Sequence, residues 1–407
     1  MNSKPLNVTV AESAPGATSS PANQPGLMVR ILRTVAEVEE FRSVWTAWRG
    51  HRDSDIDFFL MLLESREEIL HPYVVVVYRN GVPDAMMIGR LERRQLGYGV
   101  GYLHLFRAWT RIFTFQYGAL RGNDSDENCA EIIRAILNSL KSGEADLALL
   151  DHPRSDSALY KRALSIPGFL SRDRVIDMRP RRMMRLPATM EEVYLGLSGK
   201  HRKHLKSEAK KLRAEFHLNT CCVRDVEELA RITPKVEEVA KKTYQRGLGV
   251  GFEDTPRMGA LLRLYAKKGW LRIYVLYAAD TPIVFWIGAV YDGWFYSDCT
   301  GYDPHYRDYA PGAFLFVQMI EDFCREGLQG IDFGLGDADY KKRFSNESFE
   351  EATVYLFAPR AKGLLLNALH TATSAADIGI KRVLSRTQLL MKVKRLWRDR
   401  LAQKGAK

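Results

Sequence analysis

The chain has 407 residues, of which 46% are hydrophobic, 11% aromatic and 27% charged. That composition excludes a chain that is disordered throughout, and at roughly 100–200 residues per domain it predicts two or three domains. The most apolar stretches, such as 73–78 and 282–291, have the length of strands and fall far short of the roughly 20 residues that a membrane-spanning helix needs. The net charge of +11 is uneven, because residues 381–407 hold ten Lys or Arg against one Asp. The rest of the chain is therefore nearly neutral.

The cysteines and the first residues indicate a reducing compartment. The five cysteines are odd in number, two are adjacent and none forms a CxxC pair, so neither a disulfide framework nor a zinc site is expected. Residues 1–27 are rich in Ser, Pro, Ala, Asn and Gly and lack the charged and apolar regions of a signal peptide. We expect a disordered leader and a cytoplasmic protein.

The pattern of apolar residues predicts an α+β first half. In chain order the expected elements are a strand at 28–33, helices at 37–45 and 56–63, strands at 73–78 and 84–91, a Gly-rich aromatic stretch at 97–118, a helix at 126–140 and a buried strand at 146–150. Asn80-Gly81 joins the second and third strands. Asn-Gly between two apolar runs predicts a tight hairpin, because both residues adopt positive φ readily.

The second half repeats that order of elements. The expected elements are a strand ending at 185–187, helices at 191–197, 200–216, 226–244 and 257–267, strands at 271–277, 283–291 and 294–300, a helix at 312–326 and short strands at 330–334 and 353–358. We therefore predict the fold class α+β, with two tandem domains of one ancestry, each a mixed, largely antiparallel sheet flanked by helices. After residue 359 the pattern is helical and then basic.

The segment 296–315 is the richest in chemistry. A strand ends, a polar loop follows, and a helix begins at Pro311 or Gly312, where the free N–H groups and the positive end of the helix dipole suit a phosphate. Gly312 and Ala313 leave the backbone accessible, and Arg307 adds a cation. The spacing Arg307-x-x-Ala310-x-Gly312 resembles the Arg/Gln-x-x-Gly-x-Gly/Ala loop that holds the pyrophosphate of coenzyme A in GNAT acyltransferases, with Ala310 in place of the first Gly. An ordinary strand–loop–helix connection is the alternative.

Two more segments stand out. Residues 330–344 end a short strand in a Gly-rich, acidic turn followed by Tyr-Lys, which gathers Asp332, Asp337, Tyr340 and Lys341 near the same strand ends. Residues 198–213 predict an amphipathic helix covered with basic side chains, and a solvated helix face is its simplest interpretation. His201 and His204 lie three residues apart, but no third ligand has suitable spacing, so we expect no metal site.

Together these segments resemble one family. Leu-Ser-x-Lys-x-Arg-x-x-Leu from Leu197, Gly-Tyr-Asp at 301–303 and Asp-Phe-Gly-x-Gly with Tyr-Lys at 332–341 are similar to the FemAB-like branch of the GNAT superfamily, and more narrowly to the acyltransferase domain of CelD (BcsL)-type proteins found with exopolysaccharide genes. The resemblance covers roughly 185–358. It implies a degenerate GNAT-like domain at 28–180, an acyl-CoA-binding GNAT domain at 181–359 and a basic amphipathic helical tail at 360–407, after the leader at 1–27.

The resemblance also implies an activity, which is transfer of an acyl group, acetyl being the simplest, from acyl-CoA to an amine or hydroxyl in polysaccharide or cell-envelope biosynthesis. Asp298 is the base candidate and Tyr340 the candidate acid for the thiolate. Their alternatives are a solvent-facing Asp, or one paired with Arg307, and a packed aromatic. We expect acyl-CoA contacts from Arg307 and Ala310 to Ala313. The expected substrate-binding residues are Asp332, Asp337 and Lys341.

Two other functions remain open. A Fem-type ligase that takes an aminoacyl group from tRNA would carry a long helical arm, but only about 45 residues, 226–270, separate the flanking segments, and they predict two ordinary helices. A catalytically inactive scaffold, docked by its basic tail, is the third hypothesis. In the tail, apolar residues recur at near-helical spacing from Val383 to Leu401, which indicates either peripheral contact with the anionic inner face of a membrane or packing on the body. Nucleic acid is a lesser option, because Trp397 is the tail's one aromatic residue.

Overall fold

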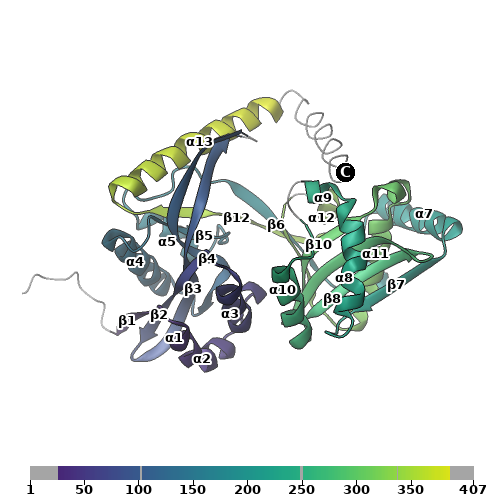
Figure 1. Ribbon diagram of the computed structural model, residues 1–407, viewed down its shortest axis with the longest axis horizontal. Helices are drawn as coiled ribbons and strands as arrows, with labels where there is room; N and C mark the ends of the chain where they lie inside the picture. The colour runs from purple at the N-terminus through teal and green to yellow at the C-terminus, as the bar shows by residue number, and fades with distance from the viewer. Residues whose placement is uncertain (1–25, 101–102, 248–250, 337, 386–407) are drawn as a thin grey trace, which may run out of the picture.

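The computed structural model describes residues 26–100, 103–247, 251–336 and 338–385 and contains two sheets with helices packed on them (Figure 1). The first sheet has the strand order β1-β2-β3-β4-β5-β13, and the second has the order β12-β6-β11-β10-β9-β8-β7. We call the first sheet with α1–α5 and α13 the N-terminal lobe, and the second sheet with α6–α12 the C-terminal lobe. The predicted α+β class with two mixed, largely antiparallel sheets is confirmed.

The N-terminal lobe follows the predicted order with some differences in extent, and it adds a helix at 158–165 that the pattern did not predict. Its elements are β1 (Leu27–Leu32), α1 (Val35–Glu40), α2 (Arg42–Ala47), η1 (Arg52–Ser54), α3 (Ile56–Ser65), β2 (Ile69–Arg79), β3 (Val82–Val100), β4 (Leu103–Gly122), α4 (Asp126–Ser142), β5 (Leu147–Leu150) and α5 (Ala158–Ser165). Asn80 and Gly81 both have positive φ, 53° and 81°, and form the expected hairpin turn. The Gly-rich aromatic stretch is the distal part of a long β3–β4 hairpin (Figure 1).

The C-terminal lobe also keeps the predicted order. Its elements are β6 (Met178–Arg185), α6 (Met190–Gly196), α7 (Gly199–Glu215), β7 (Leu218–Val223), α8 (Leu229–Lys241), α9 (Tyr244–Gly247), α10 (Pro256–Lys267), β8 (Leu271–Ala278), β9 (Thr281–Tyr291), β10 (Trp294–Tyr302), η2 (Pro304–Tyr309), α11 (Pro311–Arg325), β11 (Gly330–Leu335), α12 (Asp339–Phe344) and β12 (Glu347–Ala352). The pattern did not predict β7, α12 or β12. The segment 226–270 holds the two ordinary helices α8 and α10 and the single turn α9.

One strand crosses between the lobes. The strand expected at 353–358 is β13 (Val354–Phe357), but it pairs with β5 in the first sheet and not with the second sheet. A single residue, Thr353, separates it from β12 of the second sheet. The end of the proposed domain 181–359 therefore returns to the N-terminal lobe, because its residues 354, 356 and 357 are buried in that lobe's cores.

Four apolar cores lie among the described residues. Two lie in the N-terminal lobe: a large one beneath α1–α5 that includes Trp45 and Phe113, and a smaller one that includes Ile112 and Phe357. The second sheet has a core on each face: Phe295 and Phe323 lie on the α6, α7 and α11 face, and Ile273 and Phe285 lie on the α8 and α10 face. Each face of the second sheet is thus an apolar surface covered by helices, which is the usual driving force for such layers.

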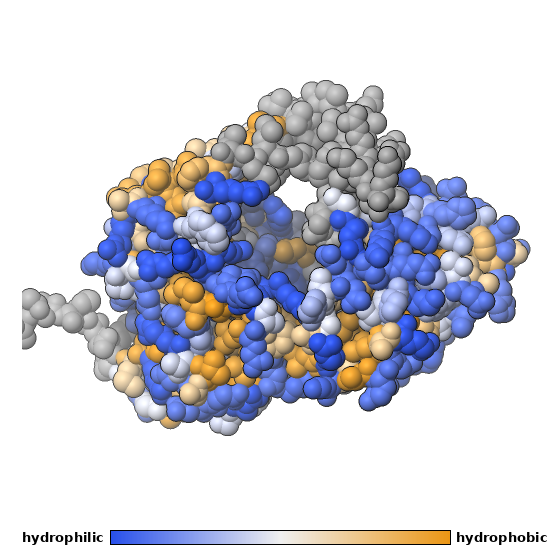
Figure 2. All heavy atoms as spheres, viewed as in Figure 1, coloured by the Kyte–Doolittle hydropathy of each residue, from blue (hydrophilic) through white to orange (hydrophobic). Residues whose placement is uncertain are grey.

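The last described helix, α13 (Ala361–Ser385), lies along the β3–β4 hairpin (Figure 1). Leu366 is buried beneath it, whereas Leu365 is exposed, and Figure 2 shows hydrophobic residues gathered over the start of this helix. None of the helices in the described ranges is long and apolar enough to cross a membrane. The predicted basic tail falls largely on residues 386–407, outside the described residues.

Candidate active site

The clearest feature of the second sheet is a split between two parallel strands. β10 and β11 pair over only three residues each, Trp294–Tyr296 with Gly330–Asp332, and then diverge. A bulge in β10 between Ser297 and Cys299 shifts its register against β9, which bends the strand at the point where the split begins. Backbone groups beyond Tyr296 on this edge are thereby released from the β10–β11 ladder and can serve a ligand.

The loop before α11 lies on one side of this split. Ala310 has φ 46° and ψ 47°, the left-handed conformation that glycine adopts most easily, so the loop keeps a glycine-like backbone despite the alanine. Pro311 occupies the first helical turn and Ala310 caps no backbone N–H with its side chain. A Cβ added at Gly312 would have no atom within 4 Å. This helix start is therefore open, with room beside its backbone.

Basic and aromatic residues surround that helix start. Arg307 is exposed in η2, and the loop is anchored by buried Asp303, which accepts hydrogen bonds from the His305 backbone N–H at 3.0 Å and from Lys242 Nζ at 2.9 Å. The side chain of Arg213, on α7, lies over the ring of Phe314 at 5.0 Å. A cavity of about 230 Å³ between α7 and α11 includes Ala310, Ala313 and Arg213 in its wall.

On the other face of the sheet, a second cavity of about 210 Å³ lies between the lobes. Figure 2 shows the molecule hollowed between its two halves, with hydrophilic residues around the hollow. The cavity wall combines residues of both lobes, and three of them, Ser297, Gly334 and Leu335, belong to the diverging ends of β10 and β11. The remaining lining residues are His51, Arg52, Asp53, Tyr117, Asp151, His152, Arg181, Tyr296 and Asp332. The split thus opens into a polar cavity to which both lobes contribute.

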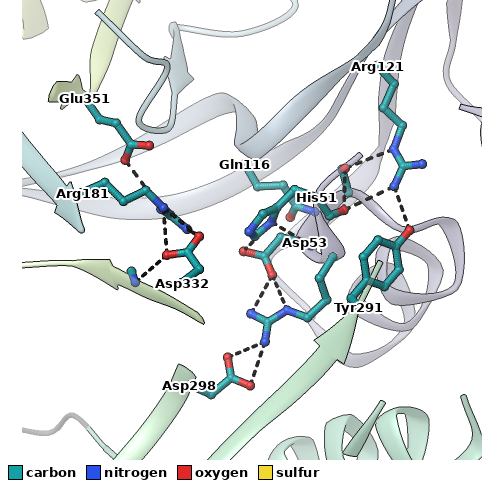
Figure 3. Close-up of polar contacts among 12 residues, drawn as sticks. His51, Asp53, Gln116, Arg121, Arg181, Tyr291, Asp298, Asp332 and Glu351 are labelled. Atoms are coloured by element: carbon teal, nitrogen blue, oxygen red, sulfur yellow. Dashed lines mark hydrogen bonds and ion pairs between the residues drawn. The ribbon is translucent and has the colours of Figure 1, made fainter. Parts of the chain in front are cut away.

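Two buried ion-pair networks form part of the wall (Figure 3). Arg181 binds Asp332 through Nε, at 3.1 and 3.0 Å from the two carboxylate oxygens, and through Nη2 at 2.6 Å, while its Nη1 lies 3.6 Å from Glu351. Arg52 binds Asp53 at 2.8 Å and Asp298 at 2.8 Å, and so joins the N-terminal lobe to β10. Burial raises the pKa of Glu351 to about 7, and Arg181 opposes that rise.

The backbone of the N-terminal lobe is shaped to bring side chains into this cavity. β4 is bulged where Leu120 and Phe115 pair with Met87 and Gly89, and the bulged residues include Tyr117. Gly118 has φ 67°, and a Cβ there would lie 2.2 Å from the Cβ of His51. Only glycine lets the loop that carries His51 pack so closely against β4.

The residues that the sequence singled out occupy different places. The side chain of Asp298 is 20% exposed and pairs with Arg52, not with Arg307, and desolvation raises its pKa while Arg52 opposes that rise. Asp332 lines the cavity between the lobes. Lys341 Nζ donates to the backbone carbonyls of Phe333 and Leu335, both at 2.6 Å, and burial lowers its pKa to about 8. Lys341 therefore fixes the free end of β11.

Tyr340 lies on the opposite face of the sheet from Asp298. Its ring packs against Trp286 and Phe333, with centroids 5.7 and 6.0 Å apart, in the core beneath α11. The expectation that Asp298, Tyr340 and Lys341 line one cleft is therefore wrong for Tyr340, because α12 places its ring against the core beneath α11, whereas Asp298 pairs with Arg52 of the N-terminal lobe. Asp337 lies outside the described residues. Among the residues that the structure describes, no group of three or more His, Cys, Asp or Glu could hold a metal ion.

Sequence reasoning missed most of the cavity wall. His51, Asp53, Tyr117, Asp151, His152 and Arg181 were not singled out, although His51-Arg52-Asp53 and Asp151-His152 are short runs of ionisable residues at the ends of elements. The contacts that bring these segments together join residues more than 100 positions apart, such as Arg52 with Asp298 and Arg181 with Asp332, so no local spacing points to the cavity.

Comparisons with known proteins agree with this geometry. Residues 199–342 match the family model described as an acetyltransferase (GNAT) domain. The structure is similar to that of FemX, with 11% identity, a TM-score of 0.58 and coverage of 81% of this chain and 98% of that one. Similarity to a conserved protein of unknown function from Bacteroides thetaiotaomicron (11% identity, TM-score 0.47, 81% and 100% coverage) and to L-PGS from Bacillus licheniformis (12%, 0.44, 79% and 97%) is weaker.

No curated protein matches the sequence. The family match spans α7 to α12, which are the elements that contain the split and the open helix start. The likeness to FemX covers most of both chains and shows the fold. The chain therefore has a fold like that of FemX, and its residues 199–342 match the acetyltransferase (GNAT) domain model.

Proposed function

We propose that this protein transfers an acyl group, acetyl being the simplest, from acyl-CoA bound by the C-terminal lobe to an amine or hydroxyl acceptor held between the lobes. The observation that carries the proposal is the split between β10 and β11, which has the open start of α11 on one face of the sheet and a polar cavity on the other. A thioester placed in the split would reach an acceptor in the cavity, and holding both reactants in that geometry supplies much of the rate enhancement of acyl transfer.

The residues divide into roles on this basis. The N–H groups at the start of α11 and the helix dipole would hold the pyrophosphate, with Arg307 as a nearby cation and Ala310 to Ala313 as the loop that approaches it. Released backbone groups of β10 would polarise the thioester carbonyl. Tyr340 stands on the coenzyme face, where it would protonate the leaving thiolate. Asp298 stands on the acceptor face and would act through Arg52, because that ion pair already occupies it.

The absence of a long helical arm favours acyl-CoA over aminoacyl-tRNA as the donor. The described residues between β7 and β8 form α8, α9 and α10, of which the longest has 13 residues. The narrower assignment to CelD-type proteins, and to polysaccharide or cell-envelope biosynthesis, rests on the sequence motifs and is proposed with the same test.

The test is differential scanning fluorimetry of the full chain with acetyl-CoA, with longer acyl-CoAs and with aminoacyl-tRNA. Ligand at a hundred times its Kd stabilises a protein by about 2.7 kcal/mol, which is a clear shift in Tm. We expect a shift with an acyl-CoA and none with aminoacyl-tRNA. A shift with aminoacyl-tRNA alone would favour the Fem-type ligase, and no shift with any of the three would favour the scaffold.

We also propose peripheral contact with an anionic membrane through residues 381–407, because ten cations there are interspersed with apolar residues and each cation near such a surface contributes about 1 kcal/mol. Co-sedimentation with anionic vesicles at low salt should recover the full chain and leave a chain that ends at Ile380 in the supernatant. Equal partitioning of the two would remove the membrane role.

A further inference from the structure

His51 carries a buried polar atom with no protein partner. The backbone N–H of Asp53 donates to His51 Nδ1 at 3.1 Å, so that nitrogen bears no proton. Burial lowers the pKa of His51 to about 4, which keeps the ring neutral and places its proton on Nε2. The side chain is 9% exposed and lines the cavity between the lobes, and Nε2 finds no hydrogen-bond partner among the described residues. A bound ligand with an oxygen acceptor would satisfy this N–H.

The charges of the cavity wall favour a cation as the other part of that ligand. Three carboxylates line it, from Asp53, Asp151 and Asp332, against the two guanidinium groups of Arg52 and Arg181. Each arginine also contacts one more carboxyl group behind the wall, that of Asp298 or Glu351. Carboxylates outnumber cations, so a positively charged ligand group would be stabilised there.

Asp151 and His152 supply a base at the edge of the same cavity. They follow β5 directly, and the Asp151 backbone N–H donates to the carbonyl of Phe115 at 2.8 Å, which fixes the pair against β4. His152 Nδ1 lies 2.5 Å from Asp151 Oδ1, which makes Nδ1 the donor and leaves the Nε2 lone pair as the basic site. The Thr353 hydroxyl lies 3.3 Å from both ring nitrogens, so it can accept from Nδ1–H or donate to Nε2.

The backbone of His152 is held in an uncommon conformation. Its φ is 53°, in the left-handed region that non-glycine residues rarely adopt, and such residues persist where the surrounding structure fixes them. His152 and Ser297, at the mouth of the split, line the same cavity from opposite lobes. The base and the mouth of the split, where the proposed function places the thioester, thus belong to one cavity.

We propose that the cavity binds an acceptor with a primary amine next to hydroxyl groups, such as an amino sugar, and that His152, oriented by Asp151, removes the proton of its ammonium group. This inference rests on the proposed function and deepens it in two ways. It gives the N-terminal lobe a catalytic role, and it makes nitrogen the atom that receives the acyl group. The cavity, at about 210 Å³, is smaller than the roughly 300–1,000 Å³ of pockets for drug-sized ligands, and a single sugar ring suits it. His51 Nε2–H donates to a hydroxyl oxygen of that ring.

The reaction balances with these groups. His152 Nε2 accepts one proton from the ammonium, the free amine attacks the thioester carbonyl, a C–N bond forms and the C–S bond breaks. The amine nitrogen loses its second proton as the amide forms, and the departing thiolate takes up one proton. The sum converts an ammonium and a thioester into an amide, a thiol and one proton, with no oxidant or reductant.

The experiment uses the full chain, acetyl-CoA, and glucosamine and glucose as matched probes that differ in one group. Products are read by mass spectrometry, and acetyl-CoA binding is measured separately by calorimetry. We expect acetylglucosamine and no acetylglucose. His152→Gln should lower kcat with glucosamine about 100-fold, the usual contribution of a general base, and leave the Kd for acetyl-CoA unchanged. Imidazole added to His152→Ala should restore part of the lost rate.

Two further variants complete the test. Asp151→Asn should lower kcat while KM for glucosamine changes little, since Asp151 positions the ring of His152. His71→Gln is the matched control, because His71 lies on β2 of the same lobe, contacts the Pro72 carbonyl and does not line the cavity.

The outcomes separate this inference from the function on which it rests. Absence of acetyl-CoA binding by the unaltered chain would refute the proposed function. Binding together with acetylation of glucose, or of neither sugar, would overturn the amine-bearing acceptor. Full activity of His152→Gln, or a loss in His152→Ala that imidazole does not relieve, would overturn the role of His152.

Discussion

The two lobes arrange a strand, a helix and a parallel strand in two different ways. In the N-terminal lobe the start of α4 is closed: the Ser125 hydroxyl accepts a hydrogen bond from the Asn128 backbone N–H at 3.4 Å, and Asp126 and Glu127 fill the first turn. In the C-terminal lobe the start of α11 has no side-chain cap and no acidic residue in its first turn. One helix dipole is satisfied within the protein, and the other is left for an anion.

The strands beside these helices differ in the same sense. β4 and β5 pair over four residues each, Ile112–Phe115 with Leu147–Leu150, and the Asp151 backbone continues the contact. β10 and β11 pair over three and then separate. The comparison teaches that the N-terminal lobe closes the helix start and the strand pair that the C-terminal lobe leaves open, and that it contributes side chains to the cavity between the lobes.

The largest effect should come from the buried ion pair that braces β11 at the split. Asp332→Ala leaves Arg181 buried without its main partner, since the two side chains are 3% and 7% exposed, and should lower the free energy of unfolding by about 3–5 kcal/mol. Asp177→Ala is the control on the same strand edge, because its pair with Arg179 is more than half exposed, and it should cost less than about 1 kcal/mol. Urea denaturation measures both. Equal losses of stability would show that the Arg181–Asp332 pair stabilises the fold no more than an exposed ion pair does.

A second effect is the pH dependence of the stability of the chain, which arises from buried groups at the boundary between the lobes. The folded chain keeps the Glu351 proton up to a pKa of about 7, against an ordinary value of 4.5, so this group's stabilisation is lost as the pH rises from 4.5 to 7. His51, with its pKa lowered to about 4, has the opposite effect between pH 4 and 6.5. Glu351→Gln should therefore gain stability relative to the natural chain as the pH rises to 7, by about 2–3 kcal/mol at roughly 1.36 kcal/mol per pKa unit.

The measurement is denaturant unfolding of both proteins at intervals between pH 4.5 and 7.5. A stability difference that stays constant over this range would contradict the raised pKa of Glu351 and the burial that causes it.

A smaller effect tests the strain in the open loop. Ala310→Gly should raise the free energy of unfolding by about 1 kcal/mol, because it relieves a left-handed alanine, and it should keep acetyl-CoA affinity unchanged. Ala279→Gly, at a turn with φ 51°, should stabilise the chain similarly and is the control outside the loop. If Ala310→Gly destabilises the chain while Ala279→Gly does not, the loop conformation described here is wrong.

Much of this fold follows from the sequence. Local sequence patterns determine the Asn80-Gly81 hairpin, the apolar face of α11 and the order of elements in both lobes. The pairing of β13 with β5 is different. Leu150 and Val354 are partners although they lie 204 positions apart in the sequence, and no local pattern near either residue indicates which of the two sheets the last strand joins.

Of the candidate site, the sequence predicted the loop before α11 and, in the cavity between the lobes, Asp332. In that loop, Arg307, Ala310 and Gly312 lie within six residues, so one loop displays the whole pattern. The cavity between the lobes is assembled from distant segments, such as Arg181 with Asp332 and Arg52 with Asp298, and burial rather than spacing sets the chemistry of His51 and Glu351. Short runs of ionisable residues at the ends of elements, His51-Arg52-Asp53 and Asp151-His152, were the local signals for this cavity.

The central claim is that the open start of α11, and not the closed start of α4, binds the coenzyme. Gly312 and Glu127 occupy the same position, the second residue, of the two helices, and neither substitution should unfold the chain, since Gly312 has free space beside it and Glu127 is exposed. Calorimetric titration should show that Gly312→Val lowers the affinity for acetyl-CoA at least tenfold, or about 1.4 kcal/mol. Glu127→Val should leave that affinity unchanged. Unchanged affinity in a folded Gly312→Val protein, or a loss confined to Glu127→Val, would contradict the account.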